Sequence, residues 1–175
     1  MVESLIEIMK YVLPAFIVFL TAYFLIKSFL KKEQQKLDHQ LIVNTKQDIL
    51  PLRLTAYERL SVFLERINPN NLIIRVLQPK MTVNTFQRAL VQTIRTEYEH
   101  NISQQIYVSN QIWSAVGYSK DQLIKDINIL SGTVPPNVPA KELSKRILEF
   151  YLTREEPIPS QEALKLIKNE VKKLY

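Results

Sequence analysis

The hydrophobic pattern of the chain is dominated by one stretch, residues 11–30, with the sequence YVLPAFIVFLTAYFLIKSFL. From Tyr11 to Ile26 no residue is charged, and Pro14 and Thr21 alone are not apolar. Twenty helical residues span about 30 Å, which matches the hydrocarbon core of a bilayer. Pro14 falls in the first turn, where its missing N–H costs least. The stretch therefore predicts a transmembrane helix over residues 11–30.

A cleaved signal peptide and a buried core helix are the two other interpretations of this stretch. A signal peptide has a positive segment before its apolar part, whereas Glu3, Glu7 and Lys10 precede this one. No A-x-A-like cleavage site follows, since the next residues are KKEQQK. A core helix in a domain of this size would normally have a polar face, which residues 11–26 lack. We therefore favour a membrane anchor.

Lysines flank the predicted span unevenly, and their placement predicts its orientation. The span is preceded by Lys10 alone, and four lysines lie at its end and beyond: Lys27, Lys31, Lys32 and Lys36. Positively charged flanks stay on the cytoplasmic side of a membrane. We therefore expect a single-pass membrane protein, with a short tail of residues 1–10 outside and the C-terminal part in the cytoplasm.

The polar residues 31–50 contain no Gly or Pro and predict a helical stalk that continues the anchor. Pro51 interrupts this pattern, so we expect the helix to break there. Residues 51–175 leave room for one cytoplasmic domain. His39 stands alone in the stalk, and we expect its side chain to be solvated.

Apolar residues of this domain recur at helical spacing and predict an all-α bundle of four or five helices. The clearest face lies in residues 52–67 and consists of Ala56, Tyr57, Leu60, Phe63, Leu64 and Ile67. Other faces consist of Phe86, Leu90, Ile94 and Tyr98; of Ala140, Leu143, Ile147, Phe150 and Tyr151; and of Ala163, Leu164, Ile167, Val171 and Leu174. We expect Ser160 to cap the last helix, and Asn84 with Gln87 to form a capping box for the helix that His100 closes.

Three segments leave alternatives open. Leu72–Leu77 (LIIRVL) fits a strand or a buried helical turn, and Gln105–Val108 has weak strand character, so one short strand or hairpin is compatible with the pattern. Residues 109–130 form one helix if it runs straight through Gly117. A break at Gly117 would instead resemble a helix-turn-helix, with Ser119 and Gln122 as a capping box.

Binding of DNA by that third segment is not favoured by its charges. Two lysines and two aspartates of the second helix cancel: Lys120, Asp121, Lys125 and Asp126. The net charge of +6 is also spread along the chain, with +2 in residues 1–36 (five Lys, three Glu) and the remaining +4 in residues 37–175. A nucleic-acid-binding protein usually concentrates its positive charge.

Two smaller basic groups could still contact an anion. Lys165, Lys168 and Lys172 form a stripe on the last helix that could lie on an anionic leaflet. Arg88 and Arg95 share one face and could grip a phosphate. They support an alternative function, a module that binds anionic lipid or nucleic acid through basic helix faces.

Catalytic chemistry is not indicated by the sequence. The chain has no cysteine, two glycines and two histidines, so thiolate sites and Gly-rich phosphate loops are excluded. His39 and His100 lie far apart in sequence, and no H-x-x-x-H motif is present. We expect neither an enzyme nor a cofactor, a metal site or a small-molecule substrate.

Two blocks of sequence carry a family resemblance: LRLTAYERLSVFLERINP (Leu52–Pro69) and HNISQQIYVSNQIW (His100–Trp113). They resemble a family of small bacterial single-pass membrane proteins of unknown function, and the resemblance covers most of the chain. It implies a bacterial inner-membrane protein with a helical cytoplasmic part, and it brings no catalytic motif. The expected function is a membrane-anchored adapter or accessory subunit that binds another protein, or copies of itself, at the cytoplasmic face.

Overall fold

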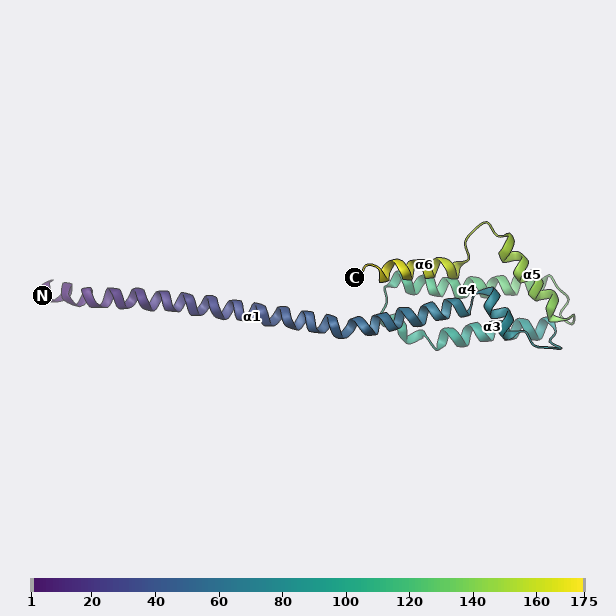
Figure 1. Cartoon of the computed structure of the whole chain (residues 1–175), viewed down its shortest axis with the longest axis horizontal. Helices are drawn as coiled ribbons and strands as arrows, with labels where there is room; N and C mark the ends of the chain where they lie inside the picture. The colour runs from purple at the N-terminus through teal and green to yellow at the C-terminus, as the bar shows by residue number, and fades with distance from the viewer. Residues whose placement is uncertain (1, 175) are drawn as a thin grey trace. The chain divides into compact units, whose positions relative to one another are not determined.

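A computed structural model describes the backbone of residues 2–174, and within that range the side chains of all residues except 2–15, 38–39 and 41–47. The chain divides into two compact units, Met1–Leu50 and Pro51–Tyr175. The regular elements of the described residues are α1 (Val2–Arg66), α2 (Pro69–Val76), α3 (Val83–Glu99), the 3-10 helix η1 (Ile102–Ile106), α4 (Asn110–Gly132), α5 (Ala140–Thr153) and α6 (Pro159–Val171) (Figure 1). The predicted all-α fold is thereby confirmed.

Helix α1 continues through Pro51, so the expected break at this residue is wrong. A proline inside a helix removes one backbone hydrogen bond and crowds the preceding turn. Here residues 31–50, which precede Pro51, contain no Gly or Pro. Residues 52–67, which follow it, are held in place by a buried apolar face. Thr55 donates its hydroxyl to the Pro51 carbonyl over 3.0 Å. A single proline between two good helical segments therefore does not end α1.

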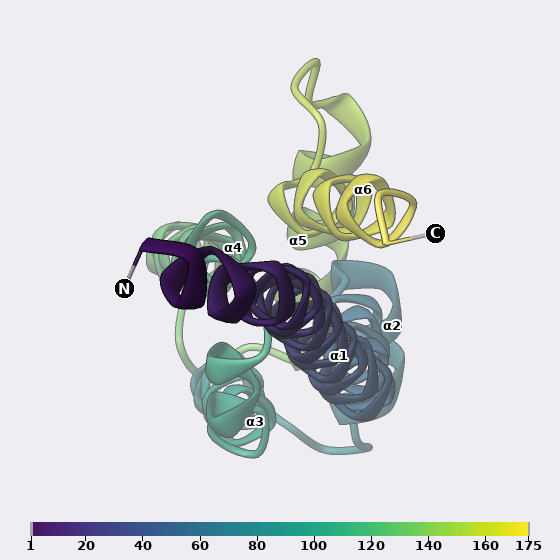
Figure 2. The same cartoon turned by 90° about the vertical axis from the view of Figure 1, so that its left-hand side faces the viewer.

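The second unit, Pro51–Tyr175, packs its helices around one core. The predicted faces supply it, with Phe63, Phe86, Leu90, Ile94, Leu143 and Ile147 each at most 1% exposed. Helix α4 packs against both α3 and α6, and α5 packs against α2, α3 and α4 (Figures 1 and 2). Counting the end of α1, six α-helices build this unit, which exceeds the expected four or five.

The extra helix is α2, which contains most of the ambiguous segment Leu72–Leu77. Asn68 caps it by accepting a hydrogen bond from the Asn70 N–H over 3.2 Å, and Pro69 occupies the first helical position. The helical alternative is therefore correct for this segment. The second ambiguous segment, Gln105–Val108, begins inside η1 and is not a strand.

Helix α3 begins two residues earlier than predicted, because Thr82 and not Asn84 caps it. The Thr82 and Thr85 hydroxyls each accept a hydrogen bond from the other residue's N–H, over 3.4 and 2.9 Å. Thr82 is extended because its neighbours pair with the loop before α5: Val83 N–H donates to Val138 and Ala140 N–H to Met81. A contact between segments more than 50 residues apart thus places the cap.

Helix α4 runs without interruption through Gly117, so the helix-turn-helix alternative is wrong. Ser119 is therefore not a cap. It is 2% exposed and donates its hydroxyl to the carbonyls of Ala115 and Pro159, over 2.7 and 2.9 Å. The second of these bonds ties α4 to the start of α6.

Ser160 does not cap α6, contrary to the prediction. The helix begins two residues earlier than predicted, with Ile158 as the N-cap residue and Pro159 in the first helical position, for which its ring is preorganised. Ser160 is consequently inside the first turn and buried, at 6% exposure. By contrast, His100 closes α3 as its C-cap residue, as expected.

In the residues whose side chains the structure describes, no helix has both the length and the apolar character needed to cross a membrane. Residues 11–15 of the predicted span lie outside those residues. Helix α1 covers the backbone of both the predicted span and the predicted stalk. The membrane-spanning role stays a prediction.

Candidate functional site

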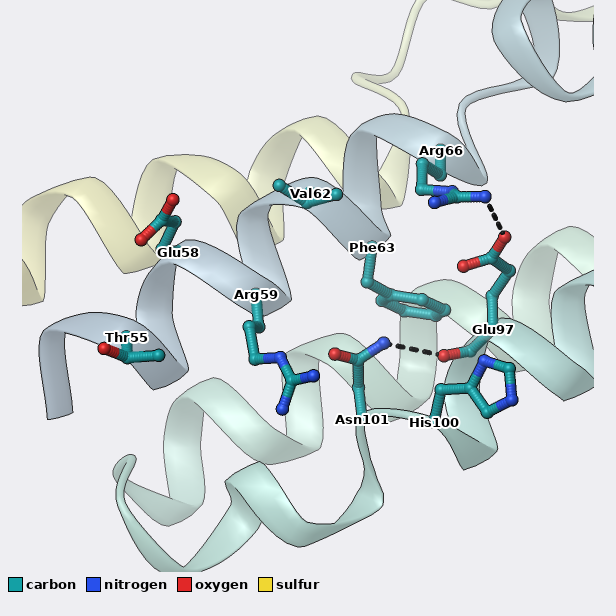
Figure 3. Close-up of a pocket in the computed structure, with 9 residues that line it drawn as sticks. All are labelled: Thr55, Glu58, Arg59, Val62, Phe63, Arg66, Glu97, His100 and Asn101. Atoms are coloured by element: carbon teal, nitrogen blue, oxygen red, sulfur yellow. Dashed lines mark hydrogen bonds and ion pairs between the residues drawn. The ribbon is translucent and has the colours of Figure 1, made fainter. Parts of the chain in front are cut away.

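A pocket of about 390 Å³ lies between the domain part of α1 and the end of α3 (Figure 3). Helix α1 contributes four polar or charged residues to its wall: Thr55, Glu58, Arg59 and Arg66. Glu97, His100 and Asn101 contribute the opposite wall, and Phe63 forms part of the floor. The helical spacing of the α1 residues, at three and four positions apart, brings them to one side of that helix.

Two ion pairs hold Glu97 in place in the wall of this pocket. Glu97 Oε1 lies 2.8 Å from Arg66 Nη2 and 3.3 Å from Arg75 Nη1, and its side chain is 16% exposed. Asn101 donates its side-chain amide to the Glu97 carbonyl over 2.8 Å, which holds the turn after α3 (Figure 3). The carboxylate therefore joins α1, α2 and α3 at one point.

The charges of the lining residues balance, since two arginines, Arg59 and Arg66, stand against two glutamates, Glu58 and Glu97. Its size falls in the range of small-molecule sites, about 300–1,000 Å³, but such sites are mostly apolar. Among the described residues, no group of three His, Asp or Glu side chains could hold a metal ion. The pocket is therefore more polar than a typical small-molecule site.

A second polar cluster joins α1, the start of α4 and α6 around Glu170. Its carboxylate accepts hydrogen bonds from the Tyr57 and Ser109 hydroxyls, each over 2.5 Å. Arg53 Nη2 lies 3.8 Å from Glu170 Oε1 and donates to the Tyr57 hydroxyl over 2.9 Å. Arg53 Nε also donates to the Tyr107 carbonyl over 3.2 Å. No pattern in the sequence predicted this cluster.

Burial alone would raise the pKa of Glu170, but the hydrogen bonds from Ser109 and Tyr57 and the charge of Arg53 outweigh it, and the pKa is lowered. Burial, followed by the hydrogen bond to Glu170, raises the pKa of the Tyr57 phenol. The folded state therefore favours an ionised carboxylate beside a neutral phenol. In this state the Tyr57 and Ser109 hydroxyls donate to the carboxylate, and Arg53 donates to the Tyr57 oxygen.

We expect Glu170→Gln to lower the free energy of unfolding by about 2 kcal/mol at pH 7, because hydrogen bonds to a charged acceptor are lost. A carboxylate with a lowered pKa stabilises the fold above its ordinary value of 4.5 and loses that contribution as the pH falls below it. The difference between variant and wild type should therefore shrink below pH 4.5. Urea unfolding at several pH values, followed by the fluorescence of Trp113, measures it.

Glu155→Gln is the matched control for this change. Glu155 is exposed in the loop between α5 and α6, and it makes no hydrogen bond or ion pair within the described part of the chain. We expect it to change the free energy of unfolding by less than about 0.5 kcal/mol at every pH. An equal effect of the two substitutions would contradict a special role of Glu170.

The predicted anion-binding residues divide between two helices. Lys165, Lys168 and Lys172 are exposed on α6, whereas Arg88 and Arg95 are exposed on α3. Both helices pack on α4, and the structure does not bring the two groups together into one site. The flanking lysines Lys27, Lys31, Lys32 and Lys36 are exposed along α1. Binding of lipid or nucleic acid by any of these residues stays a prediction.

A third polar cluster that the sequence analysis missed surrounds Asp126, a residue 5% exposed on α4. Tyr151 donates its hydroxyl to Asp126 over 2.8 Å, Gln122 donates its amide over 2.9 Å, and an Arg154 nitrogen lies 3.6 Å away. In the sequence, Asp126 entered only the charge balance of the would-be second helix. Tyr151 and Arg154, at the end of α5, pair with this carboxylate, and the packing of α5 on α4 that brings them there has no signal in the sequence.

Comparison with known proteins gives a family without an assigned activity. Residues 3–174 match the model of a family of unknown function, DUF7935, and the chain belongs to this family. No curated protein and no solved structure matches the chain. The family match thus confirms one part of the resemblance, namely that the chain belongs to an uncharacterised family. A bacterial source and a single membrane span stay predictions.

Proposed function

We propose that this protein is a membrane-anchored adapter, or accessory subunit, whose helical domain binds another protein at the cytoplasmic face of the inner membrane. The observation that carries the proposal is the exposure of the apolar segment of α1. Large apolar residues between Phe16 and Leu30 expose 37–70% of their surface, on all sides of the helix. Contiguous apolar surface of this kind marks a segment that a membrane or a partner covers.

The lipid bilayer is the environment that best fits this segment. The apolar side chains surround the helix, whereas a partner protein would cover one face. Lys27, Lys31 and Lys32 follow at its C-terminal end, where lysine stems can extend to lipid headgroups. The same lysines support an orientation with residues 1–10 outside and the domain inside the cell.

The domain supports the binding part of the proposal. The pocket between α1 and α3 combines a partly exposed ion pair, Arg66 with Glu97, with exposed polar groups. The domain also has exposed apolar side chains, among them Ile106 at 74% and Leu52 at 51% exposure. Surfaces that combine apolar and charged groups in this way are typical of transient protein interfaces.

Arginine substitution inside the apolar segment tests the anchor. We expect Leu20→Arg combined with Phe24→Arg to release the chain from membranes, since each arginine disfavours insertion by about 3 kcal/mol. Leu37→Arg, outside the predicted span, is the control and should leave the chain in the membrane fraction. Washing of membranes with alkaline carbonate distinguishes the variants, and release of the wild-type chain by this wash would overturn the anchor.

Affinity purification of the intact chain from detergent-solubilised membranes tests the adapter. We expect a protein partner in stoichiometric amount, identified by mass spectrometry. A homogeneous monomer at native expression level would contradict the proposal. Because this readout does not depend on the carbonate wash, failure of the anchor and failure of the adapter are distinguishable.

A further inference from the structure

A groove of about 450 Å³ lies between the domain part of α1 and α6, on the far side of α1 from most of the pocket in Figure 3. Its walls consist of Leu54, Tyr57, Glu58 and Ser61 on α1, and of Ile167, Lys168, Val171 and Lys172 on α6. The surface between the walls is mostly apolar. Tyr57, Ile167 and Val171 pack against the core beneath it.

The spacing of these residues gives the groove the length of two helical turns. On α1 they stand at i, i+3, i+4 and i+7, and on α6 at i, i+1, i+4 and i+5. Seven residues of helix rise about 10 Å. A groove bounded by two helices over two turns is the shape that receives one further helix, through apolar anchors three and four positions apart.

The two walls carry opposite charges. Lys168 and Lys172 are exposed on the α6 wall, and Lys165 stands one turn before them. Glu58 is exposed on the α1 wall, and Glu65 stands two turns further along the same side. Within the described residues, Glu58, Lys168 and Lys172 form no ion pair with one another or with other side chains. Their charges are therefore available to an occupant.

This charge pattern decides which occupant fits. An anionic lipid headgroup would meet the two lysines but also face Glu58, whereas a helix can present a different charge on each flank. A second copy of this chain is a poor occupant, because α3, α4, α5 and α6 already bury their apolar faces in their own core. The complement is a separate amphipathic helix with one acidic and one basic flank.

We propose that the α1–α6 groove binds one amphipathic helix of the partner protein. Apolar residues at i, i+3 or i+4, and i+7 of this helix fill the groove. Its acidic flank lies along Lys168 and Lys172, and a basic flank lies along Glu58. The inference rests on the adapter function proposed above and assigns its docking surface.

Site-specific photo-crosslinking in living cells tests this assignment on the full chain. Ser61→p-benzoylphenylalanine places the photoreactive group on the groove wall, and Ser114→p-benzoylphenylalanine places it on an exposed position of α4 as the control. We expect one discrete protein adduct from position 61 and none from position 114. Mass spectrometry of the crosslinked peptide should show apolar residues three and four apart with acidic neighbours.

Charge reversal then tests the flanks. Lys168→Glu combined with Lys172→Glu should lower the yield of the position-61 adduct at least tenfold, because like charges then face each other. Lys125→Glu combined with Lys141→Glu, on α4 and α5, makes the same change in net charge and should leave the yield unchanged. The fluorescence of Trp113 checks that both variants are folded.

Several outcomes would overturn the inference: an adduct with lipid, an adduct with a second copy of the chain, no adduct at position 61, or a yield that charge reversal does not change. Affinity purification separates this failure from failure of the adapter function. If the wild-type chain still retains a stoichiometric partner, the adapter stands and the groove is not its docking surface. If no partner is retained, both proposals fail.

Discussion

Phe63→Ala is expected to lower the free energy of unfolding by about 4 kcal/mol, which is a large effect for one apolar substitution. Phe63 is 1% exposed, and its ring meets Tyr98 edge to face at a centroid distance of 5.9 Å. Tyr98 in turn stacks on Trp113 at 5.2 Å. The substitution removes the buried ring and leaves a cavity beside this aromatic row, which links α1, α3 and α4.

The neighbouring residue provides a matched control. Val62→Ala lies on the same helical turn, but Val62 is 50% exposed, so we expect a loss of less than about 1 kcal/mol. Trp113 is the chain's one tryptophan and belongs to the aromatic row, so its fluorescence reports urea unfolding of the domain. A loss below 1 kcal/mol for Phe63→Ala would show that the domain can collapse around the missing ring.

The core of the domain was predictable because helical periodicity is a local property of the sequence. Ala56, Leu60 and Phe63 share one face of α1 whatever the rest of the chain does, and burial of that face follows from its apolar character. The same reasoning identified Phe86, Leu90 and Ile94 on α3. Such patterns need no knowledge of which helix packs on which.

Helix starts were less predictable, since contacts distant in sequence decide them. Asn84 and Ser160 are good capping residues, but Thr82 is fixed as the cap by pairing beside it with the loop before α5. At α6 the determinant is local instead, because Pro159 suits the first helical position and moves the start of the helix ahead of Ser160. A capping side chain stabilises a helix end by about 1 kcal/mol, which a few tertiary contacts can outweigh.

The polar clusters and the α1–α6 groove could not be located from the sequence. Tyr57 and Ser109 stand 113 and 61 residues from Glu170 and meet it only through the packing of three helices. Lys168 and Glu58 face the same groove although they belong to opposite ends of the domain sequence. Helical spacing predicts which residues share a face, but not which faces meet.

The family match extends over both parts of the chain. It covers residues 3–174, and therefore includes the apolar segment of α1 as well as the helical domain.

Asp126→Ala is expected to lower the free energy of unfolding by about 3 kcal/mol, because it removes a buried carboxylate that accepts two side-chain hydrogen bonds and pairs with an arginine. Tyr151 and Gln122 lose the acceptor of their hydrogen bonds, over 2.8 and 2.9 Å. Burial, followed by the hydrogen bond to Asp126, raises the pKa of the Tyr151 phenol well above its usual range, so the phenol remains a donor throughout the neutral range. Arg154 keeps a second partner, Glu156, at 2.9 Å, which limits the loss.

The control for this substitution lies on the same helix. Asp121 pairs with Lys120 over 3.0 Å, but its side chain is 72% exposed, so Asp121→Ala should cost less than about 0.5 kcal/mol. Urea unfolding of both variants at pH 7, followed by Trp113 fluorescence, gives the comparison. Equal stability of the Asp126→Ala variant and the wild-type chain would show that burying this carboxylate costs as much as its three contacts return, and that the cluster fixes the position of α5 without stabilising the fold.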